Sequence, residues 1–317
     1  MEPGPKSLRR KKIIVIVGPT ASGKSELAVH LAKRFNGEII SADSRQVYRG
    51  LDRGTGKVPG RWQKKAGGER FIYKSIPHYC IDTVSPKKQF SVTEFTRDAK
   101  NAIEKIRMRG KIPIIAGGAG FWIDAIVYNL NLPEVRPNMK LRKILAQKSA
   151  EKLFHFLKKI DSKRASKIDP RNPRRLIRAI EIAYAIGKSP KIKKRAAYDT
   201  LWIGIKTLPD ILKLKIKKRL ATRLREGMIE EAVLLRKKGL SWKRFYALGL
   251  EYRFLADYLQ KKMGREELSE RLFCAIWHYA KRQMTWFKKN KEIRWVESKK
   301  KAYFLTKEFL NLQKSSA

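Results

Sequence analysis

Short, continuous apolar runs alternate with longer segments of helical periodicity in the first part of the chain. The runs near 13–17, 38–42 and 111–116 have the length of strands that are buried on both faces of a sheet. Between them, 25–35 and 91–109 repeat apolar residues every three or four positions, as amphipathic helices do. Strands that alternate with helices predict an α/β fold with a doubly wound parallel sheet, whose ligands bind at the carboxyl ends of the strands.

Local signals place further elements around this core. Ser91 and Glu94 form a capping-box pattern that starts the helix ending before Gly110. Weaker apolar runs predict a short third strand at Tyr79–Asp82, a helix at Gly120–Val127, a strand at Leu201–Lys206 and a last short strand at Ile293–Val296.

The strand pattern stops between about 132 and 198. Prolines separate short amphipathic helices there, and the clearest helix begins at Asn172-Pro173 and ends at Gly187. We therefore expect one core with an insertion. The parts are a P-loop α/β core at 1–131, a helical insertion at 132–198, and a return to the core at 199–317, with helices at 209–238, 249–261 and 266–288.

A glycine-rich segment directly follows the first strand. Its glycines allow backbone N–H groups to turn inward on an anion, and a helix that starts near Lys24 directs its positive dipole end to the same place. Lys24 can reach a terminal phosphate, and the Ser25 hydroxyl can bind Mg²⁺. The pattern predicts a P-loop that holds a diphosphate, formed by Gly18, Pro19, Thr20, Ala21, Ser22, Gly23, Lys24 and Ser25.

The chain is strongly basic over its whole length. Its 317 residues include 74 Lys and Arg against 29 Asp and Glu, which gives a formal charge of +45. A folded surface with this charge repels itself unless a polyanion covers it, so nucleic acid is the favoured partner. The alternative is a general lysine bias, or adaptation to a salty or hot habitat.

Other residue types exclude several classes of protein. Cys80 and Cys274 are too few for a disulfide framework or a zinc ribbon, and they fit a reducing cytoplasmic environment. The four histidines show no metal-ligand spacing. No apolar run approaches a membrane span, and the basic Lys6–Lys12 stretch leads into the P-loop strand without the apolar region of a signal peptide. We expect a cytoplasmic protein without a targeting signal.

Polar residues follow the second strand, at the edge where the P-loop is expected. Asp43 could hold Mg²⁺ through water, cap the next turn or accept a proton during a reaction, and its position does not separate these roles. Gln46 carries an amide that can pair with an adenine edge. The strand before Gly117 lacks the terminal Asp of a Walker B segment, which disfavours ATP hydrolysis, although Asp82 could substitute.

Basic residues repeat four positions apart on two predicted helices. Like charges at this spacing destabilise an isolated helix, so contacts to phosphates explain these faces better than solvation does. The residues are Lys215, Arg219 and Arg223 on one helix, and Arg171, Arg174, Arg175 and Arg178 around the start of the other.

Taken together, the motifs resemble those of the tRNA dimethylallyltransferases (the tRNA isopentenyltransferase family). The P-loop is followed by Ala-Asp-Ser-Arg-Gln-Val-Tyr at 42–48 and by Gly-Thr-Gly-Lys at 54–57. The P-loop alone is shared with kinases, whereas 42–48 and Tyr-Ala-Lys-Arg-Gln at 279–283 are far more specific. The match covers almost the whole chain in the family's order, through Phe90-Ser91-Val92, Gly117-Gly118, Asp169-Pro170 and Asn172-Pro173.

The resemblance implies a reaction. Members transfer a dimethylallyl group from dimethylallyl diphosphate to N6 of the adenosine 3′ of the anticodon (position 37) of tRNA, and they release pyrophosphate with the assistance of Mg²⁺. It also implies that Lys24, Asp43 and Arg219 are catalytic, with Asp43 as the general base. Further implied contacts are the P-loop and Lys215 for the diphosphate, Ser25 for Mg²⁺, and, for the tRNA anticodon stem-loop, Asp43, Ser44, Arg45, Gln46, Ala119, Arg142, Arg174, Arg175, Arg178, Lys281, Arg282 and Gln283.

Two single residues and one residue pair depart from the family's pattern. Ala119 stands where the family usually has a threonine that assists at the diphosphate. Lys215 stands where it commonly has an arginine on the pyrophosphate, so a point charge replaces a bidentate fork. Ile276-Trp277 replaces a frequent Thr-Arg pair.

These departures leave two alternative functions open. One is an enzyme of another kind, either a prenyltransferase that acts on a free adenine nucleotide or a small-molecule P-loop kinase. The other is a non-catalytic RNA-binding protein that keeps a P-loop. One tRNA can occupy one such body, so we expect the tRNA-modifying protein to be a monomer.

Overall fold

The computed structural model describes residues 11–65, 68–190 and 194–311, so the basic Lys6–Arg10 stretch lies outside the described residues. The chain divides into two compact units. One comprises Met1–Tyr128 with Ala196–Ala317, and the other comprises Asn129–Arg195. The insertion expected at 132–198 is shifted by three residues from the second unit.

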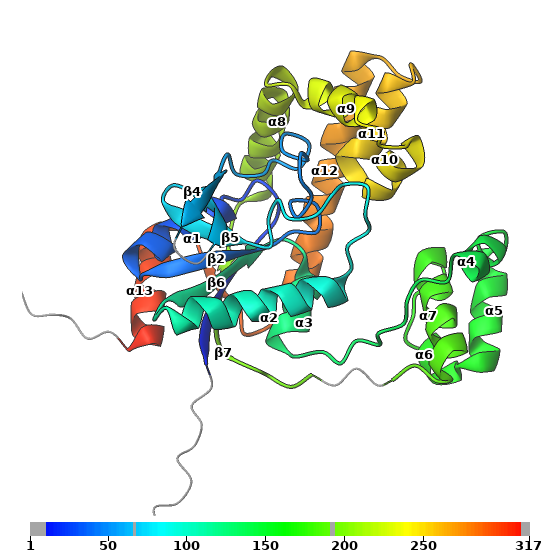
Figure 1. Cartoon of the computed structure of the whole chain (residues 1–317), viewed down its shortest axis with the longest axis horizontal. Coiled ribbons are helices and arrows are strands. Elements are labelled where there is room, and N and C mark those ends of the chain that lie inside the picture. The colour runs from blue at the N-terminus through cyan, green and yellow to red at the C-terminus, as the bar shows by residue number, and fades with distance from the viewer. Residues whose placement is uncertain (1–10, 66–67, 191–193, 312–317) are drawn as a thin grey trace, which may run out of the picture. The chain divides into compact units, whose positions relative to one another are not determined.

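An eight-stranded sheet with the order β3-β4-β5-β2-β6-β1-β7-β8 forms the centre of the larger unit (Figure 1). The strands from β5 to β8 run parallel, which confirms the predicted α/β fold. Val17 and Ala42 both pair with Gly117, so the segments after β1, β2 and β6 leave the sheet at the same edge. The strands are β1 (Lys12–Val17), β2 (Gly37–Ala42), β3 (Arg61–Lys65), β4 (Gly68–Tyr73), β5 (Ile76–Tyr79), β6 (Ile112–Gly117), β7 (Asp199–Ile205) and β8 (Arg294–Val296).

Two features at the β3–β5 edge differ from the prediction. The third parallel strand, β5, ends at Tyr79 rather than beginning there, because Cys80 and Asp82 have φ angles of 56° and 54°, outside the strand region. The antiparallel β3–β4 hairpin was not predicted. Most described residues of β3 are exposed, so an apolar pattern that would mark a strand is missing from this edge.

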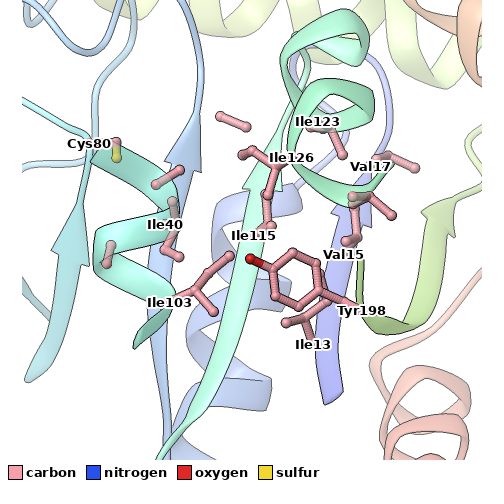
Figure 2. Packing of buried hydrophobic residues seen from close by; sticks show 14 of the residues in the cluster. Ile13, Val15, Val17, Ile40, Cys80, Ile103, Ile115, Ile123, Ile126 and Tyr198 are labelled. Atoms are coloured by element: carbon pink, nitrogen blue, oxygen red, sulfur yellow. The ribbon is translucent and has the colours of Figure 1, made fainter. Parts of the chain in front are cut away.

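Helices cover both faces of the sheet. Ile14 and Ile16 of β1 pack with α1 (Lys24–Arg34) and α13 (Lys299–Leu310). Figure 2 shows the opposite face, where Ile13, Val15 and Val17 point toward residues of α2 (Val92–Met108) and α3 (Gly120–Val127). Burial on both faces explains the continuous apolar runs. The predicted capping box is present, because Ser91 and Glu94 each accept a hydrogen bond from the other's backbone N–H.

A second layer of helices follows β7 and encloses its own core (Figure 1). The single helix predicted at 209–238 is two helices, since Gly227 has a φ of 100° and ends the first helical path. The short α10 was not predicted, and neither was α13. The helices are α8 (Pro209–Arg225), α9 (Met228–Lys237), α10 (Trp242–Leu248), α11 (Leu250–Leu259) and α12 (Arg265–Phe287).

The smaller unit is helical. Its core contains Leu153, Leu157, Leu176 and Ile180, which are completely buried. As predicted, Asn172 caps the last helix by accepting a hydrogen bond from the Arg175 N–H. The helices are α4 (Met139–Leu145), α5 (Ala150–Ile160), α6 (Ser162–Ala165) and α7 (Pro173–Ile186).

Candidate functional site

The P-loop forms a tight turn between β1 and α1. Gly18 and Gly23 have φ angles of 154° and 95°, and Ala21 also has a positive φ of 62°. A Cβ at Gly18 would lie 3.0 Å from the Ser22 hydroxyl. Gly23 is the N-cap of α1 and has no side chain to bond the first-turn amides. These N–H groups are therefore directed to the cavity in front of the helix, as in an anion site.

A cavity of about 350 Å³ lies at this carboxyl edge of the sheet. The P-loop forms one wall, β2 and β6 form the floor, α8 contributes Arg219, and α12 contributes Tyr279 and Gln283. Its lining consists of Thr20, Ala21, Gly23, Lys24, Ser25, Glu26, Ile39, Ser41, Asp43, Gln46, Thr55, Gly56, Lys57, Val58, Pro59, His78, Ile81, Ala116, Gly117, Gly118, Arg219, Tyr279 and Gln283.

Lys24 at the start of α1 and Arg219 on α8 both line this cavity. Burial, together with the positive charge of Arg219, lowers the pKa of the Lys24 ammonium from 10.5 to about 7, although Asp43 opposes the shift. Lys24 donates to the Pro19 carbonyl at 2.6 Å, and Arg219 donates to the Gly56 carbonyl at 2.7 Å. An anion between the two cations would relieve their repulsion and replace part of the lost hydration.

Asp43 lies directly after β2, where its carboxylate both caps a turn and lines the cavity. Oδ1 accepts from the N–H groups of Arg45 and Gln46 at 2.8 and 3.3 Å, so this oxygen caps the turn. The carboxylate also lines the cavity, and its charge acts on Lys24, Arg219 and Tyr279. One of the three expected roles, the turn cap, is thus present, and it leaves the second oxygen available for a ligand.

Helix α12 reaches the cavity with the buried Gln283 and the half-buried Tyr279. Gln283 Oε1 accepts from the Thr20 N–H at 2.8 Å, and its Nε2 donates to the Gly118 carbonyl at 3.0 Å. The amide expected to contact tRNA therefore joins the P-loop to the end of β6. Burial, and then the charge of Asp43, raises the pKa of the Tyr279 phenol, which stays protonated beside the carboxylate.

The cavity wall near β5 is mainly apolar. Ile39, Val58, Pro59 and Ile81 lie there with the imidazole of His78. Burial lowers the pKa of His78 to about 4, and its Nδ1 lies 2.9 Å from the Ile76 carbonyl. The ring is neutral near pH 7, so this wall carries no charge from His78.

Several of the expected site residues lie outside the cavity. Lys215 is exposed one helical turn before Arg219 and is not among the described residues that line the cavity. Of the two basic residues of this helix expected at the diphosphate, Arg219 lines the cavity and Lys215 does not. The half-buried Ser44, Arg45 and Ala119 are sequence neighbours of residues that line the cavity. Gly18, Pro19 and Ser22 are buried within the P-loop and do not line the cavity.

The basic residues of α8 do not form one continuous surface. Arg223 is buried and pairs with Glu251 at 3.1 Å, so an acid from α11 neutralises it. The sequence analysis missed this ion pair because Glu251 lies far from Arg223 in the sequence and no acidic residue lies on the same face of the helix. On α12, by contrast, Lys281 and Arg282 are exposed.

The basic residues of the smaller unit separate into two groups. Arg142 and Arg178 donate to Glu181, whose side chain is 1% exposed. Burial alone would raise the pKa of Glu181, but these hydrogen bonds outweigh it and hold the pKa below its ordinary value. Arg174 and Arg175 are exposed, so their charges are available for phosphate contacts.

The described residues contain no group of three His, Cys, Asp or Glu side chains that could hold a metal ion. Ser25 is exposed on the cavity and Asp43 also lines it. One hydroxyl and one carboxylate suit Mg²⁺, which keeps several waters and binds substrate phosphates. Within 11–65, 68–190 and 194–311, none of the helices has the length and hydropathy of a membrane span.

A family model described as IPP transferase matches residues 46–290, and one described as isopentenyl transferase matches residues 11–73. The chain belongs to the IPP transferase family. A "tRNA dimethylallyltransferase 2" from Treponema denticola is 42% identical to this chain, over 89% of the chain and 95% of the relative. A "tRNA dimethylallyltransferase 1" from Syntrophus aciditrophicus is 39% identical, over 90% and 94%.

Solved structures of IPP transferases have the same fold. A full-length tRNA isopentenylpyrophosphate transferase from Bacillus halodurans superposes with a TM-score of 0.68 at 33% identity, and covers 95% of this chain and 96% of its own. A eukaryotic dimethylallyltransferase described as acting on tRNA gives a TM-score of 0.78 at 27% identity, with coverages of 97% and 81%.

Sequence reasoning missed several cavity residues of this IPP transferase. His78, Lys57 and Tyr279 line the cavity, but none was assigned a function. Lys57 and Tyr279 lie in motifs that carried the family resemblance, and this was the available signal. For His78 the signal was weaker, because a lone histidine without metal-ligand spacing suggests an ordinary surface or core residue.

Proposed function

We propose that the chain transfers a dimethylallyl group from dimethylallyl diphosphate to N6 of adenosine 37 of tRNA, with release of pyrophosphate. The supporting observation is one cavity that combines the P-loop, two facing cations and the Asp43 carboxylate. A P-loop alone would suit a kinase. Here the basic surface and the IPP transferase membership favour an RNA acceptor.

The P-loop amides, Lys24 and Arg219 would bind the diphosphate. As the allylic C–O bond breaks, its electron pair leaves with pyrophosphate, and these donors stabilise the added charge. Mg²⁺ held by Ser25 would supply further charge neutralisation on the diphosphate. The apolar wall of Ile39, Val58, Pro59 and Ile81 would receive the dimethylallyl group.

Asp43 would act as the general base. As N6 attacks the allylic carbon, its proton passes to the Asp43 oxygen that does not cap the turn. The backbone hydrogen bonds to Oδ1 hold the carboxylate in position. The exocyclic amine is a weak nucleophile, so its alignment with the allylic carbon matters as much as proton removal.

The anticodon stem-loop would be bound by exposed cations. Lys281, Arg282, Arg174 and Arg175 are suited to contact the RNA backbone. Adenosine 37 must leave the stack of the loop to reach the cavity, which costs a few kcal/mol. We further infer that the protein acts as a cytoplasmic monomer on one tRNA.

An in vitro assay tests the function. Purified protein, dimethylallyl diphosphate, Mg²⁺ and a tRNA with adenosine 37 should yield N6-dimethylallyl-adenosine, detected by mass spectrometry of digested nucleosides. Absence of product with several such tRNAs would contradict the proposal. A parallel reaction with AMP separates the alternative, since product from AMP alone would indicate a small-molecule enzyme.

A further inference from the structure

The segment Asp52–Lys57, whose last three residues line the cavity, is held by the helices that follow β7. Glu231 on α9 accepts from three consecutive backbone N–H groups: Oε2 accepts from Asp52 and Arg53 at 2.8 and 2.6 Å, and Oε1 accepts from Gly54 at 2.9 Å. The Tyr252 hydroxyl of α11 also donates to Oε1, at 2.7 Å. A carboxylate offers about four acceptor positions, so all of them are used.

Arg223 of α8 holds the carbonyl side of the same segment. Its guanidinium donates to the carbonyl oxygens of Arg53 and Gly54 and pairs with Glu251. Backbone donors and acceptors of the segment are therefore bound by opposite charges from separate helices. A Cβ on Gly54 would overlap the Tyr252 hydroxyl, so the backbone lies directly against α11.

The far end of the segment touches the proposed diphosphate-binding group. The Gly56 carbonyl accepts from Arg219 at 2.7 Å, and Gly56, with a φ of 60°, leaves no space for a Cβ beside that guanidinium. Lys57, whose side chain is 2% exposed, is bonded to Asp52, Asp82 and the Tyr48 carbonyl. The segment thus connects Glu231 to Arg219 through its backbone.

We propose that Glu231 is a positioning residue for the diphosphate. It fixes Asp52–Gly54, and through the Gly56 carbonyl this segment sets where the Arg219 guanidinium lies in the cavity. The inference rests on the proposed function for the identity of the ligand. Glu231 itself touches no substrate, because it binds the segment on the side of α9 and α11.

Glu231→Gln tests this role. The amide keeps one acceptor oxygen and directs an N–H₂ group at donors, so the segment loses part of its anchor. By calorimetry, the Kd of Mg²⁺-pyrophosphate should rise about tenfold or more, because a small displacement of a binding group has a large effect. The KM for dimethylallyl diphosphate should rise similarly, with the KM for tRNA within about twofold of its original value.

Two controls separate positioning from general damage. Glu230→Gln makes the same charge change on the exposed neighbouring residue. Tyr252→Phe removes the fourth partner of Glu231 but leaves the three loop amides bonded. Both should keep the pyrophosphate Kd within about twofold of the original, and hydrogen exchange of the amides at 52–54 should accelerate only in Glu231→Gln.

Equal pyrophosphate affinity in Glu231→Gln and Glu230→Gln would overturn the inference. The inference would also be overturned if circular dichroism showed a lower fraction of folded Glu231→Gln protein and that lower fraction accounted for the whole loss of pyrophosphate affinity. If the unaltered protein binds pyrophosphate but makes no product, the proposed function fails, and the affinity series still decides the role of Glu231.

Discussion

At the residue scale, the hydrogen bonds within the protein determine which polar atoms of the cavity remain available for a ligand. Asp43 uses Oδ1 for the turn, Gln283 uses both amide atoms for backbone groups, and Lys57 is enclosed by acids and a carbonyl. Lys24 and Arg219 donate to carbonyl or hydroxyl oxygens, and within the described residues neither forms an ion pair with a carboxylate. These two cations are therefore the groups best suited to an incoming diphosphate.

Asp43→Asn separates the turn-capping role of this residue from its role as a base. The amide oxygen can still accept from Arg45 and Gln46, whereas the side chain can no longer take the N6 proton. We expect kcat to fall by about 10²- to 10⁴-fold with tRNA affinity unchanged. Single-turnover kinetics and a filter-binding assay measure the two quantities. Activity within a few-fold of the original would remove Asp43 as the base.

The low pKa of Lys24 predicts proton uptake on binding. Between pH 7 and 10.5 the unfolded chain holds this proton and the free folded protein largely does not, so this group makes stability rise with pH across that range. A bound diphosphate favours the ammonium and raises its pKa.

Calorimetry at pH 8.5 in two buffers of different ionisation enthalpy should therefore show uptake of up to one proton by Lys24 when pyrophosphate binds. Affinity should decline from pH 7 to 9. Lys24→Met is the reference, since it retains any proton uptake by pyrophosphate itself. Identical uptake in both proteins would contradict the assignment.

At the element scale, α12 serves two surfaces. Tyr279 and Gln283 line the cavity, while Lys281 and Arg282 are exposed to solvent. Helical spacing places Tyr279 and Gln283, four positions apart, on one face, and Arg282, three positions after Tyr279, lies over the Tyr279 ring at the margin of that face. The same helix also lies against Gly120, where a Cβ would overlap Trp286. Thus α12 fixes the start of α3 as well as the P-loop.

Gln283→Leu should weaken this connection between elements. It removes the hydrogen bonds to the Thr20 N–H and the Gly118 carbonyl, so we expect the free energy of unfolding to fall by about 1–3 kcal/mol. The pyrophosphate Kd should also rise. Denaturant unfolding and calorimetry measure these effects, with Glu270→Gln, an exposed change on the same helix, as control. Unchanged unfolding and binding would show that the connection is dispensable.

At the scale of the whole molecule, net charge dominates. A formal charge of +45 is spread over the chain, and the described structure neutralises only part of it through pairs such as those of Glu181, Glu251 and Glu38. Exposed cations consequently attract a polyanion over a wide surface. Such attraction steers association and is reduced by salt.

The affinity for tRNA should therefore depend steeply on salt. If six to ten phosphates are contacted, the association constant falls by about 10³- to 10⁵-fold between 50 and 200 mM salt. Fluorescence anisotropy with a labelled anticodon stem-loop measures the slope. Arg174→Gln should make the slope shallower by about one unit, whereas Arg142→Gln should mainly lower the stability of the smaller unit. A flat salt response would contradict binding through exposed cations.

Local patterns allowed much of the fold to be predicted. The P-loop, β2, β6, α3 and the capping box of α2 depend on apolar runs and on residues a few positions apart. The β3–β4 hairpin, α10 and α13 were not predicted; β3 is exposed, and α13 packs on residues of β1 that lie almost 300 positions away in the sequence. The site was predicted where a motif contains its own chemistry, as for Lys24 and Asp43.

The amino-acid sequence by itself determined the parallel core, the anion loop and the basic character of this protein, because each is encoded in neighbouring residues or in composition. The tertiary structure decided which charged and polar groups are free to act. The hydrogen bond from the Asp52 N–H to Glu231 joins residues 179 positions apart in the sequence. The hydrogen bond from the Thr20 N–H to Gln283 joins residues 263 positions apart. A side chain's type limits what it can bond, but only the folded chain supplies its partner.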